Sequence, residues 1–541
     1  MARKFAPQIL YARKGEKFLF QFGEGMCHQE LPEGTRVIYP GVRADGERSR
    51  RHIEERLIQA LDQPTGTPPL REKLRQLRQT KATPKIVFAF DDVSLPLPPM
   101  KSPDIRAIMM DQVERICLEE GVTDLEFICA IALHRPIRPD EFRHLCGSRL
   151  YHKYFPGRMR NYNAIDPHDN VHLGHTEKGE DVEVCRSVAE ADLLIYFNVN
   201  YVAMDGGYKS YATGLVSHRS LRHNHDSQTL RHTRSLYDPP RSLMHQSFTR
   251  IGKMIQQKID IFHIESVLDE NLFPWHLAWV QKLDRELSLF EKVLMYSSVW
   301  GLKLLPHWLR LKIFWATRGP FGLVALNAGE TSAVHQKTLE ACYTDKIVEV
   351  EGQCDILLLA PTCIGPYTKD TYLNPLLVNT YALGYYYNMY LDGVPLVRPG
   401  GVVIVVNPLP YKWTEPTHTL YREFFEKVLS SHRGLDEFEA FQEEFAQDQR
   451  LNDLYRRGLA PAGVHGFYMY TWAAHGMDQV GKVYAVGCGT DHRGADILGW
   501  ECCKSVMEAV AAARRHLGNP EAAVSYFRCP PVGYIRVKQA P

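Results

Sequence analysis

Short apolar runs that end in polar loops recur along the first half of the chain. They cover residues 85–90, 127–133 and 191–199, and a helical pattern spans 104–121 between the first two. Continuous apolar runs of this length are typical of buried strands, and strand, loop and helix in repeated order are typical of a parallel sheet covered by helices. This half of the chain therefore predicts an α/β unit.

The same order of signals returns after residue 350. Apolar runs at 354–361 and 400–408 flank a helical stretch at 374–390. The sequence thus predicts an α/β fold with two α/β domains, each on a parallel-type sheet, plus helical insertions. Because ligands collect beyond the carboxyl ends of parallel strands, we expect an active-site cleft between the domains.

The domain boundaries follow from where these patterns begin and end. We expect an N-terminal α/β cofactor-binding domain at 1–255, a helical, aromatic-rich insertion at 256–320 and a C-terminal α/β domain at 321–523. The last of these carries a charged helical insertion at about 413–455, and the tail at about 524–541 could pack back on the N-terminal domain.

The most apolar stretch runs from Val293 to Ala316. It is interrupted by five polar or helix-breaking residues: Lys303, Pro306, His307, Arg310 and Lys312. Burying these charges in lipid would be costly, so the stretch does not predict a spanning helix. The pattern favours a packed or interfacial pair of amphipathic helices, and a membrane-surface or partner-binding insert is the alternative.

The charge balance and the cysteines point to an ordinary cytoplasmic protein. Among 541 residues, 64 are Lys or Arg and 63 are Asp or Glu, so no global charge attracts nucleic acid. The twelve cysteines are scattered, and Cys502 and Cys503 are too close for ordinary bridge geometry. The first residues lack the apolar core of a secretory signal. The sequence carries no information on the oligomeric state.

A glycine turn followed by a lysine is the most informative motif. Gly206 and Gly207 allow a tight turn that presents Lys209, and His225 follows 16 residues later. The surrounding stretch holds three further histidines: His218, His223 and His232. A lysine at such a turn can bind phosphate or form a covalent bond, and imidazoles are natural ligands for nickel, copper or zinc. An ordinary surface turn with a solvated lysine is the alternative.

Two further segments place polar side chains directly beyond predicted strands. Asp92 and Ser94 follow the run at 85–90 and could hydrogen-bond a ribose or phosphate, or simply cap the strand end. His134 follows the run at 127–133 and suits proton transfer near neutral pH, although a structural histidine is the alternative.

Taken together and in this order, these segments resemble the lactate racemase family of nickel-pincer nucleotide enzymes. The resemblance rests on the GGYK turn with His225, LGHTEKG at 173–179, LHRP at 133–136, and DDVSLP at 91–96, where the family has an aspartate-x-threonine-arginine-proline motif. It covers most of residues 15–230 and, more loosely, 320–410 and 460–540.

The resemblance implies a cofactor, the nickel-pincer nucleotide (nickel pyridinium-3,5-bisthiocarboxylic acid mononucleotide). It implies that Lys209 tethers this group and that His225 is the protein's nickel ligand. The residues expected to contact the nucleotide are Asp92, Ser94, Gly206, Gly207 and Trp472. The implied activity is that of a racemase or epimerase, an isomerase that removes and returns a hydride at a secondary alcohol carbon, with His134 as one base.

The chain departs from the family pattern where substrate is handled. Val199 stands ten residues before Lys209, where the family has a second catalytic histidine, and Leu95 replaces the arginine that would pair with a carboxylate. Pro375 and Val378 replace a glutamine and a lysine. We therefore expect a small hydroxylated substrate other than lactate.

Three hypotheses about the chemistry stay open at this point. In the first, Tyr201 or a water held by Asn200 supplies the second proton transfer of a racemase or epimerase. In the second, the chain is a catalytically degenerate nickel-nucleotide binding protein. In the third, Lys209 acts without the cofactor, as a Schiff-base nucleophile.

Overall fold

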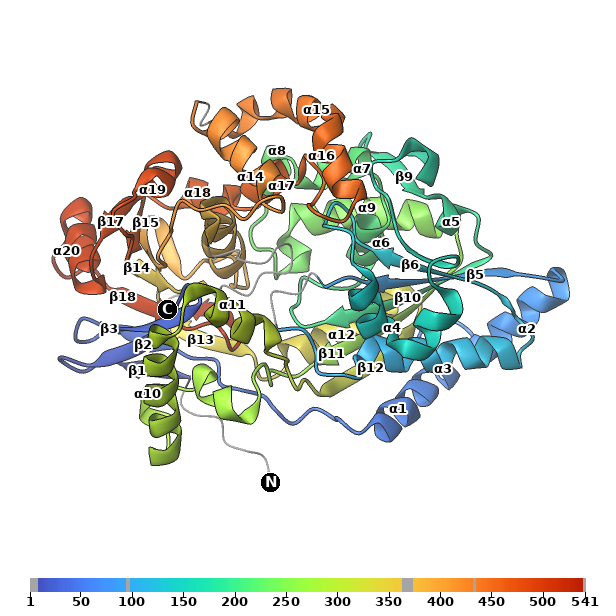
Figure 1. Ribbon diagram of the computed structural model, residues 1–541, viewed down its shortest axis with the longest axis horizontal. Coiled ribbons are helices and arrows are strands. Elements are labelled where there is room, and N and C mark those ends of the chain that lie inside the picture. Colours follow the sequence, from blue (N-terminus) through green and yellow to red (C-terminus); the bar gives the residue numbers. More distant parts are fainter. Residues whose placement is uncertain (1–7, 94–97, 362–372, 432–433, 539–541) are drawn as a thin grey trace.

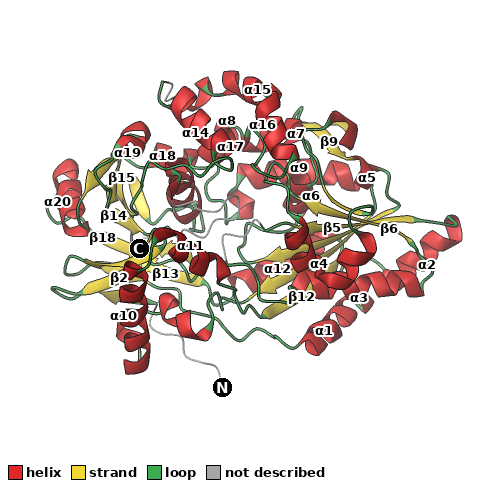
Figure 2. Ribbon diagram, in the orientation of Figure 1, coloured by secondary structure: helices red, strands yellow, loops and turns green. Residues whose placement is uncertain are grey.

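Two α/β units lie side by side along the long axis of the molecule (Figure 1). The computed structural model describes residues 8–93, 98–361, 373–431 and 434–538. Each unit has a largely parallel sheet with helices packed around it, as Figure 2 shows. The predicted fold class is therefore confirmed.

The first sheet has six strands in the order β12-β11-β10-β5-β6-β7. Their bounds are β5 Lys85–Asp91, β6 Asp124–Ala130, β7 Met159–Asn161, β10 Leu193–Asn200, β11 Ile261–Leu268 and β12 Leu323–Gly329. All neighbours pair in parallel except β12, which runs antiparallel to β11. Every residue of β10 and of β11 is buried, which explains the long apolar run that predicted β10.

Helices cover both faces of this sheet and continue into the segment that carries the candidate lysine. Their bounds are α1 Arg50–Asp62, α2 Leu70–Thr80, α3 Ile105–Glu119, α4 Pro139–Tyr154, α5 Arg186–Ala189, α6 Tyr208–Gly214, α7 His218–His225, α8 Ser227–Arg231, α9 Leu243–Gln256 and α12 Thr331–Tyr343. A hairpin of β8 (Asn170–His175) and β9 (Asp181–Cys185) lies beside them.

The second sheet has seven strands in the order β1-β4-β18-β14-β15-β16-β17. Their bounds are β1 Ile9–Tyr11, β4 Arg36–Ile38, β14 Cys354–Leu359, β15 Val397–Val406, β16 Lys482–Val486, β17 Glu501–Cys503 and β18 Val524–Phe527. Only β1 is antiparallel to its neighbour. Two smaller ribbons complete the unit: β2 (Lys17–Phe22) with β3 (Gly25–Glu30), and β13 (Ile347–Glu351) with β19 (Tyr534–Lys538).

The remaining helices belong to the second unit or to the insertions. Their bounds are α10 Leu289–Leu304, α11 His307–Ala316, α13 Pro375–Asn379, α14 Thr419–Glu423, α15 Glu439–Gln447, α16 Gln449–Arg456, α17 His465–Thr471, α18 Ala474–Gln479, α19 Arg493–Leu498 and α20 Val506–Leu517. Residues 380–386 and 424–429 are π-helical. Among the described residues, no helix combines the length and apolar composition that crossing a bilayer requires.

The sheets do not follow the boundaries drawn from the sequence. Strands β1 and β4 come from the N-terminal segment but pair within the second sheet, because β18 lies between β4 and β14. Strand β11 lies in the range expected to be a helical insertion, and β12 in the range assigned to the C-terminal domain. In β11, the buried polar residues His263, Glu265 and Ser266 interrupt the apolar run that predicts a strand.

The C-terminal tail contributes to both units. Strand β18 extends the second sheet, whereas the Tyr534 hydroxyl accepts a hydrogen bond from the Ala203 amide at 2.7 Å in the first unit. Tyr534 also packs its ring against Tyr237, with 5.8 Å between centroids. The tail therefore helps to hold the two units together near residue 203.

Candidate active site

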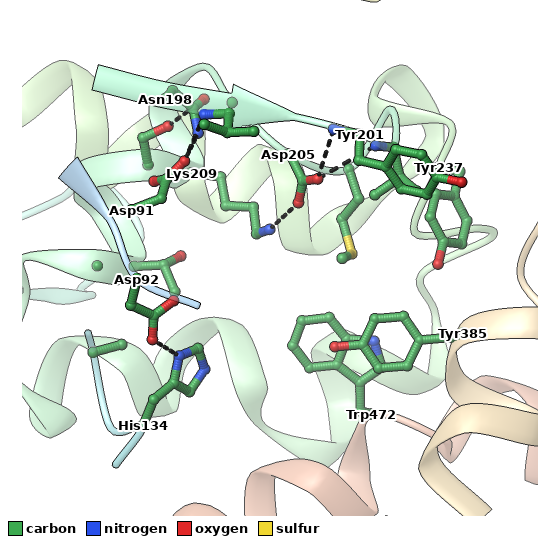
Figure 3. A pocket seen from close by; sticks show the side chains of 18 of the residues that line it. Asp91, Asp92, His134, Asn198, Tyr201, Asp205, Lys209, Tyr237, Tyr385 and Trp472 are labelled. Carbon is green, nitrogen blue, oxygen red and sulfur yellow. Dashed lines mark hydrogen bonds and ion pairs between the residues drawn. The ribbon is translucent and has the colours of Figure 1, made fainter. Parts of the chain in front are cut away.

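A pocket lies between the two units, where the cleft was expected. From the first unit it is lined by Asp91, Asp92, His134, Asn198, Lys209 and His225. From the second unit it is lined by Tyr381, Tyr385, His465, Tyr468 and Trp472. Figure 3 shows Lys209 and Asp205 on one side of this space, His134 and Asp92 on a second, and the Trp472 and Tyr385 rings on a third.

The two glycines before Lys209 are required by the backbone and by their neighbours. Gly206 and Gly207 have φ of +93° and +59°, a region that favours glycine. A Cβ on Gly207 would lie 2.6 Å from Cδ2 of His335. The Gly207 amide donates to Glu265 Oε1 at 2.6 Å, so a buried carboxylate of β11 fixes the turn.

Glu265 stays ionised in this buried position. Burial alone would raise its pKa, but the charge and hydrogen bond of His335, the charge of His263 and the Gly207 amide outweigh burial and lower the pKa to about 2. The His335 Nδ1 lies 3.3 Å from Glu265 Oε2. An ionised carboxylate therefore lies behind the glycine turn.

Lys209 sits in the first turn of α6 with its side chain in the pocket. Its Nζ donates to Asp205 Oδ1 at 3.2 Å, and the side chain is 18% exposed. The amine therefore remains accessible from the pocket while Asp205 limits where it points (Figure 3). This geometry suits a lysine that carries a covalently attached group.

His225 ends α7 as a buried, neutral imidazole on the same pocket. Its Nδ1 lies 2.5 Å from Asn224 Oδ1 and 3.3 Å from the Leu221 carbonyl, and both partners are acceptors. Nδ1 must therefore carry the proton, which leaves the lone pair on Nε2. Burial lowers the pKa of His225 to about 3, and the charge of Lys209 contributes to the shift.

His134 and Asp92 form a pair on the opposite wall. Asp92 is 2% exposed, and its Oδ2 lies 2.8 Å from His134 Nδ1. Arg106 supports this loop because its Nη1 donates to the carbonyls of Asp91 (3.0 Å) and Asp92 (2.5 Å). The carboxylate accepts from Nδ1, so proton transfer by His134 would involve Nε2.

The second unit supplies an aromatic wall. Trp472 stacks on Tyr385 with 5.4 Å between centroids and 13° between planes, and its ring lies 5.2 Å from His225. Tyr385 comes from the π-helical segment 380–386, which was expected to continue an ordinary helix. A π-helical turn shifts the side chains that follow it, and such turns are frequent at functional sites. Trp472 therefore lies on the pocket beside the candidate metal ligand.

Tyr201 lines the pocket but lies apart from Lys209. In Figure 3, Asp205 lies between the two side chains. Tyr201 is fully buried, Lys346 Nζ lies 4.9 Å from its ring centroid, and burial, with the charge of Glu270, raises its pKa well above the ordinary value. The Tyr201 hydroxyl is thus held as a neutral phenol. Val199, the residue in place of a histidine, also lines the pocket.

Two pocket residues were missed by the sequence reasoning. Asp91 accepts hydrogen bonds from the Val199 amide at 2.8 Å and the Tyr196 hydroxyl at 2.9 Å, and burial raises its pKa to about 6. His465 comes from α17, and its ring lies 5.5 Å from that of His134. The pair of adjacent aspartates at the end of β5 could have indicated Asp91. His465 lies 331 residues from His134, and no local pattern joins the two.

Some predicted positions are not described, and others lie away from the pocket lining. Ser94 and Leu95 lie outside the described residues. Pro375 and Val378 are buried in α13 and are not among the residues that line the pocket. A separate group, His172, His175 and Asp181, has side-chain ligand atoms within 4.8 Å of one another on the β8–β9 hairpin, away from the pocket lining.

The N-terminal part of the chain matches a known family. Residues 22–237 match the model of the lactate racemase N-terminal domain. The predicted relationship to the lactate racemase family is thereby confirmed, and this domain includes Asp92, His134, Lys209 and His225.

One solved structure extends the similarity in fold to the second unit. The lactate racemase apoprotein from Thermoanaerobacterium thermosaccharolyticum matches with a TM-score of 0.60 at 15% identity, over 96% of this chain and 100% of that one. A Thermotoga maritima protein matches with a TM-score of 0.46 at 13% identity, over 87% and 97% of the respective chains. No curated protein matches in sequence. The two-unit fold is thus shared with the lactate racemase apoprotein.

Proposed function

We propose that this chain is a nickel-pincer nucleotide-dependent racemase or epimerase that acts at a secondary alcohol carbon, with a substrate other than lactate. The observation that carries the proposal is that Lys209 and His225 line one pocket between the two units. An amine for covalent attachment and an imidazole for the metal are thus available to a single bound group.

The donor chemistry of the pocket fits such a group. The Nε2 of His225 keeps its lone pair because Nδ1 faces two acceptors, and neutral imidazole is a good ligand for nickel. The stacked rings of Trp472 and Tyr385 offer a flat apolar wall of the kind that planar heterocycles contact. When bound, the cofactor would supply a ring position that accepts a hydride from the substrate carbon and returns it.

His134 is the proposed base for the substrate hydroxyl. Its Nε2 would take the hydroxyl proton while Asp92 holds Nδ1–H and stabilises the imidazolium that forms. Asp92 thus has a role as a positioning residue, in addition to the nucleotide contact expected from the sequence. Asp92 follows β5 directly, and His134 lies four residues beyond the end of β6. The sheet fixes the ends of both strands.

Inversion needs proton transfer at a second position. Val199 stands where the family has a histidine and cannot move a proton, so another residue has to act there. Tyr201 is our proposed donor there, and its raised pKa suits a proton donor better than a base. His465 is a second residue to test because it lines the same pocket and its Nδ1 lies 2.8 Å from the Tyr421 hydroxyl. Burial lowers the pKa of His465 well below the ordinary value, so it enters the reaction neutral.

The pocket lining supports a substrate without a carboxylate. No arginine is among the described residues that line it, and bidentate pairing with a carboxylate is an arginine property. Phenol hydroxyls and amides are present instead, for example on Tyr237 and Asn198. These neutral groups suit a larger hydroxylated compound, such as a sugar derivative or a hydroxy ester.

Intact-mass and nickel analysis of the chain purified from the organism that encodes it tests the cofactor. We expect a covalent increment of nucleotide size that is absent from Lys209→Ala and retained in the exposed control Lys258→Ala. His225→Ala should keep the increment and lose the nickel. An unmodified wild-type chain, or an increment that survives in Lys209→Ala, would remove the basis of the proposal.

The activity is tested separately on the loaded protein. Secondary alcohols labelled with deuterium at the carbinol carbon should show inversion without exchange of that deuterium into water. No transfer with any alcohol, on a chain that carries nickel, would instead support a nickel-nucleotide binding protein without catalysis. The observation that favours this second function is Val199, which lines the pocket where the family has a histidine.

A further inference from the structure

Exposed large apolar side chains are concentrated on one helix pair. Eight of the thirteen found among the described residues lie on α10 and α11. They are Leu289 (84% exposed), Phe290 (61%), Val293 (63%), Tyr296 (53%), Trp300 (65%), Leu304 (81%), Trp308 (58%) and Ile313 (43%). Contiguous exposed apolar surface of this kind marks an interaction site.

Helix α10 has two apolar faces, and only one of them is covered. Met295 and Val299 are buried in a small core with Trp279 and Leu19. The opposite stripe, from Leu289 through Trp300 to Leu304, follows helical spacing and faces solvent. Packing within the chain therefore accounts for the apolar residues on one face of α10, whereas no contact within the described part of the chain accounts for those on the other face.

The charges beside the exposed stripe are predominantly positive. Lys303 Nζ lies 5.7 Å from the Trp300 ring centroid, and Lys312 Nζ lies 5.0 Å from that of Trp308. The only acidic residue from 289 to 316 is Glu291, which is bound to Lys282 at 2.5 Å. Glu24, which lies against α11, is paired with Arg310 at 2.7 Å. An anionic surface would thus meet lysines and indole rings beside carboxylates that are already paired.

We infer that α10 and α11 bind the surface of an anionic phospholipid bilayer and lie in its interface. Trp and Tyr favour the headgroup level, Leu and Phe enter the acyl boundary, and lysines beside them pair with anionic headgroups. The two helices are joined at Leu305 and Pro306, so together they present a broad, short surface. In Figure 1, α10 lies on the outer edge of the molecule, where a bilayer could reach it.

Vesicle flotation of the full chain tests this inference. We expect the chain to float with vesicles of phosphatidylcholine and phosphatidylglycerol at about 7:3, to float weakly with phosphatidylcholine alone, and to be released by salt because the headgroup attraction is screened. Replacing Trp300, Leu304 and Trp308 together by Ser should reduce the bound fraction at least about tenfold, since each side chain loses its apolar insertion.

A matched control keeps the result specific. Ile58→Ser and Met507→Ser remove exposed apolar side chains of 40% and 43% exposure on α1 and α20, so they should leave flotation unchanged. Circular dichroism of the triple variant should match that of the wild type because the three side chains are exposed. Failure to float with anionic vesicles would overturn the inference. So would a concentration-dependent dimer that the triple variant abolishes, which would mean that a second copy covers this face.

Discussion

The buried imidazole of His225 makes the stability of the chain depend on pH in a defined window. Burial, with the charges of Lys209 and His134, lowers its folded pKa to about 3, against about 6.5 in an unfolded chain. Because the folded pKa is depressed, the stability is present above the unfolded value and is lost as pH falls from there toward the folded value. At pH 4 the unfolded chain has gained a proton that the folded chain has not, a loss of roughly 3 kcal/mol.

Replacing His225 by Gln removes the titrating group and keeps a polar side chain of similar length. We expect the wild type to lose about 3 kcal/mol more than His225→Gln between pH 7 and pH 4 in the free energy of unfolding by urea, measured without nickel or cofactor. His152→Gln, which changes an exposed histidine on α4, should lose as much stability as the wild type. Comparing variants at the same two pH values cancels the other titrating groups.

An equal loss in the wild type and in His225→Gln would refute the reasoning. It would mean that the folded chain protonates His225 as readily as the unfolded chain does. The lone pair on Nε2 would then be occupied by a proton under mildly acidic conditions, and a neutral nickel ligand at this position would lose its physical basis.

Three further outcomes are expected. Asp92→Asn should lower kcat by about 10²- to 10⁴-fold with the nickel content unchanged, because the catalytic imidazole loses its carboxylate; an unchanged kcat would contradict that role. Gly207→Ala should abolish the mass increment and lower the melting temperature, whereas Gly518→Ala, with a similar φ of +62° and nothing within 4 Å, should affect only stability, by about 1–2 kcal/mol. Tyr201→Phe should slow one direction of inversion more than the other; equal slowing would exclude Tyr201.

The fold was predictable where the apolar pattern was local. Strands β5, β10, β14 and β15 are buried on both faces, and their continuous apolar runs indicate this directly. Strand β11 was not predicted because His263 and Glu265 interrupt its apolar pattern. In the folded chain both are buried, and their side chains lie 3.5 Å apart. Strands β4 and β18 pair although most of the sequence separates them. Hydrophobic periodicity indicates which segments are strands, but it carries no information on which distant strand is the partner.

The sequence predicted those site residues that lie together in one local motif. Lys209 and His225 follow from one segment, and both line the pocket. Asp92 was expected at the nucleotide, whereas its carboxylate lies 2.8 Å from His134, because the ends of the neighbouring strands β5 and β6 bring the two loops together. His465 and the Tyr385–Trp472 stack come from the second unit, so only the packing of the two units reveals them.

The pairing of β4 with β18 has a practical consequence for anyone who divides this protein. A fragment cut at residue 255 would carry β1 and β4 with no sheet to join, and would leave β10 without the two strands beyond it. A fragment of the first unit would therefore need to begin after β4 and to include β12 and α12, which ends at Tyr343. Since the chain passes between the units both after β4 and after α12, more than one segment joins them.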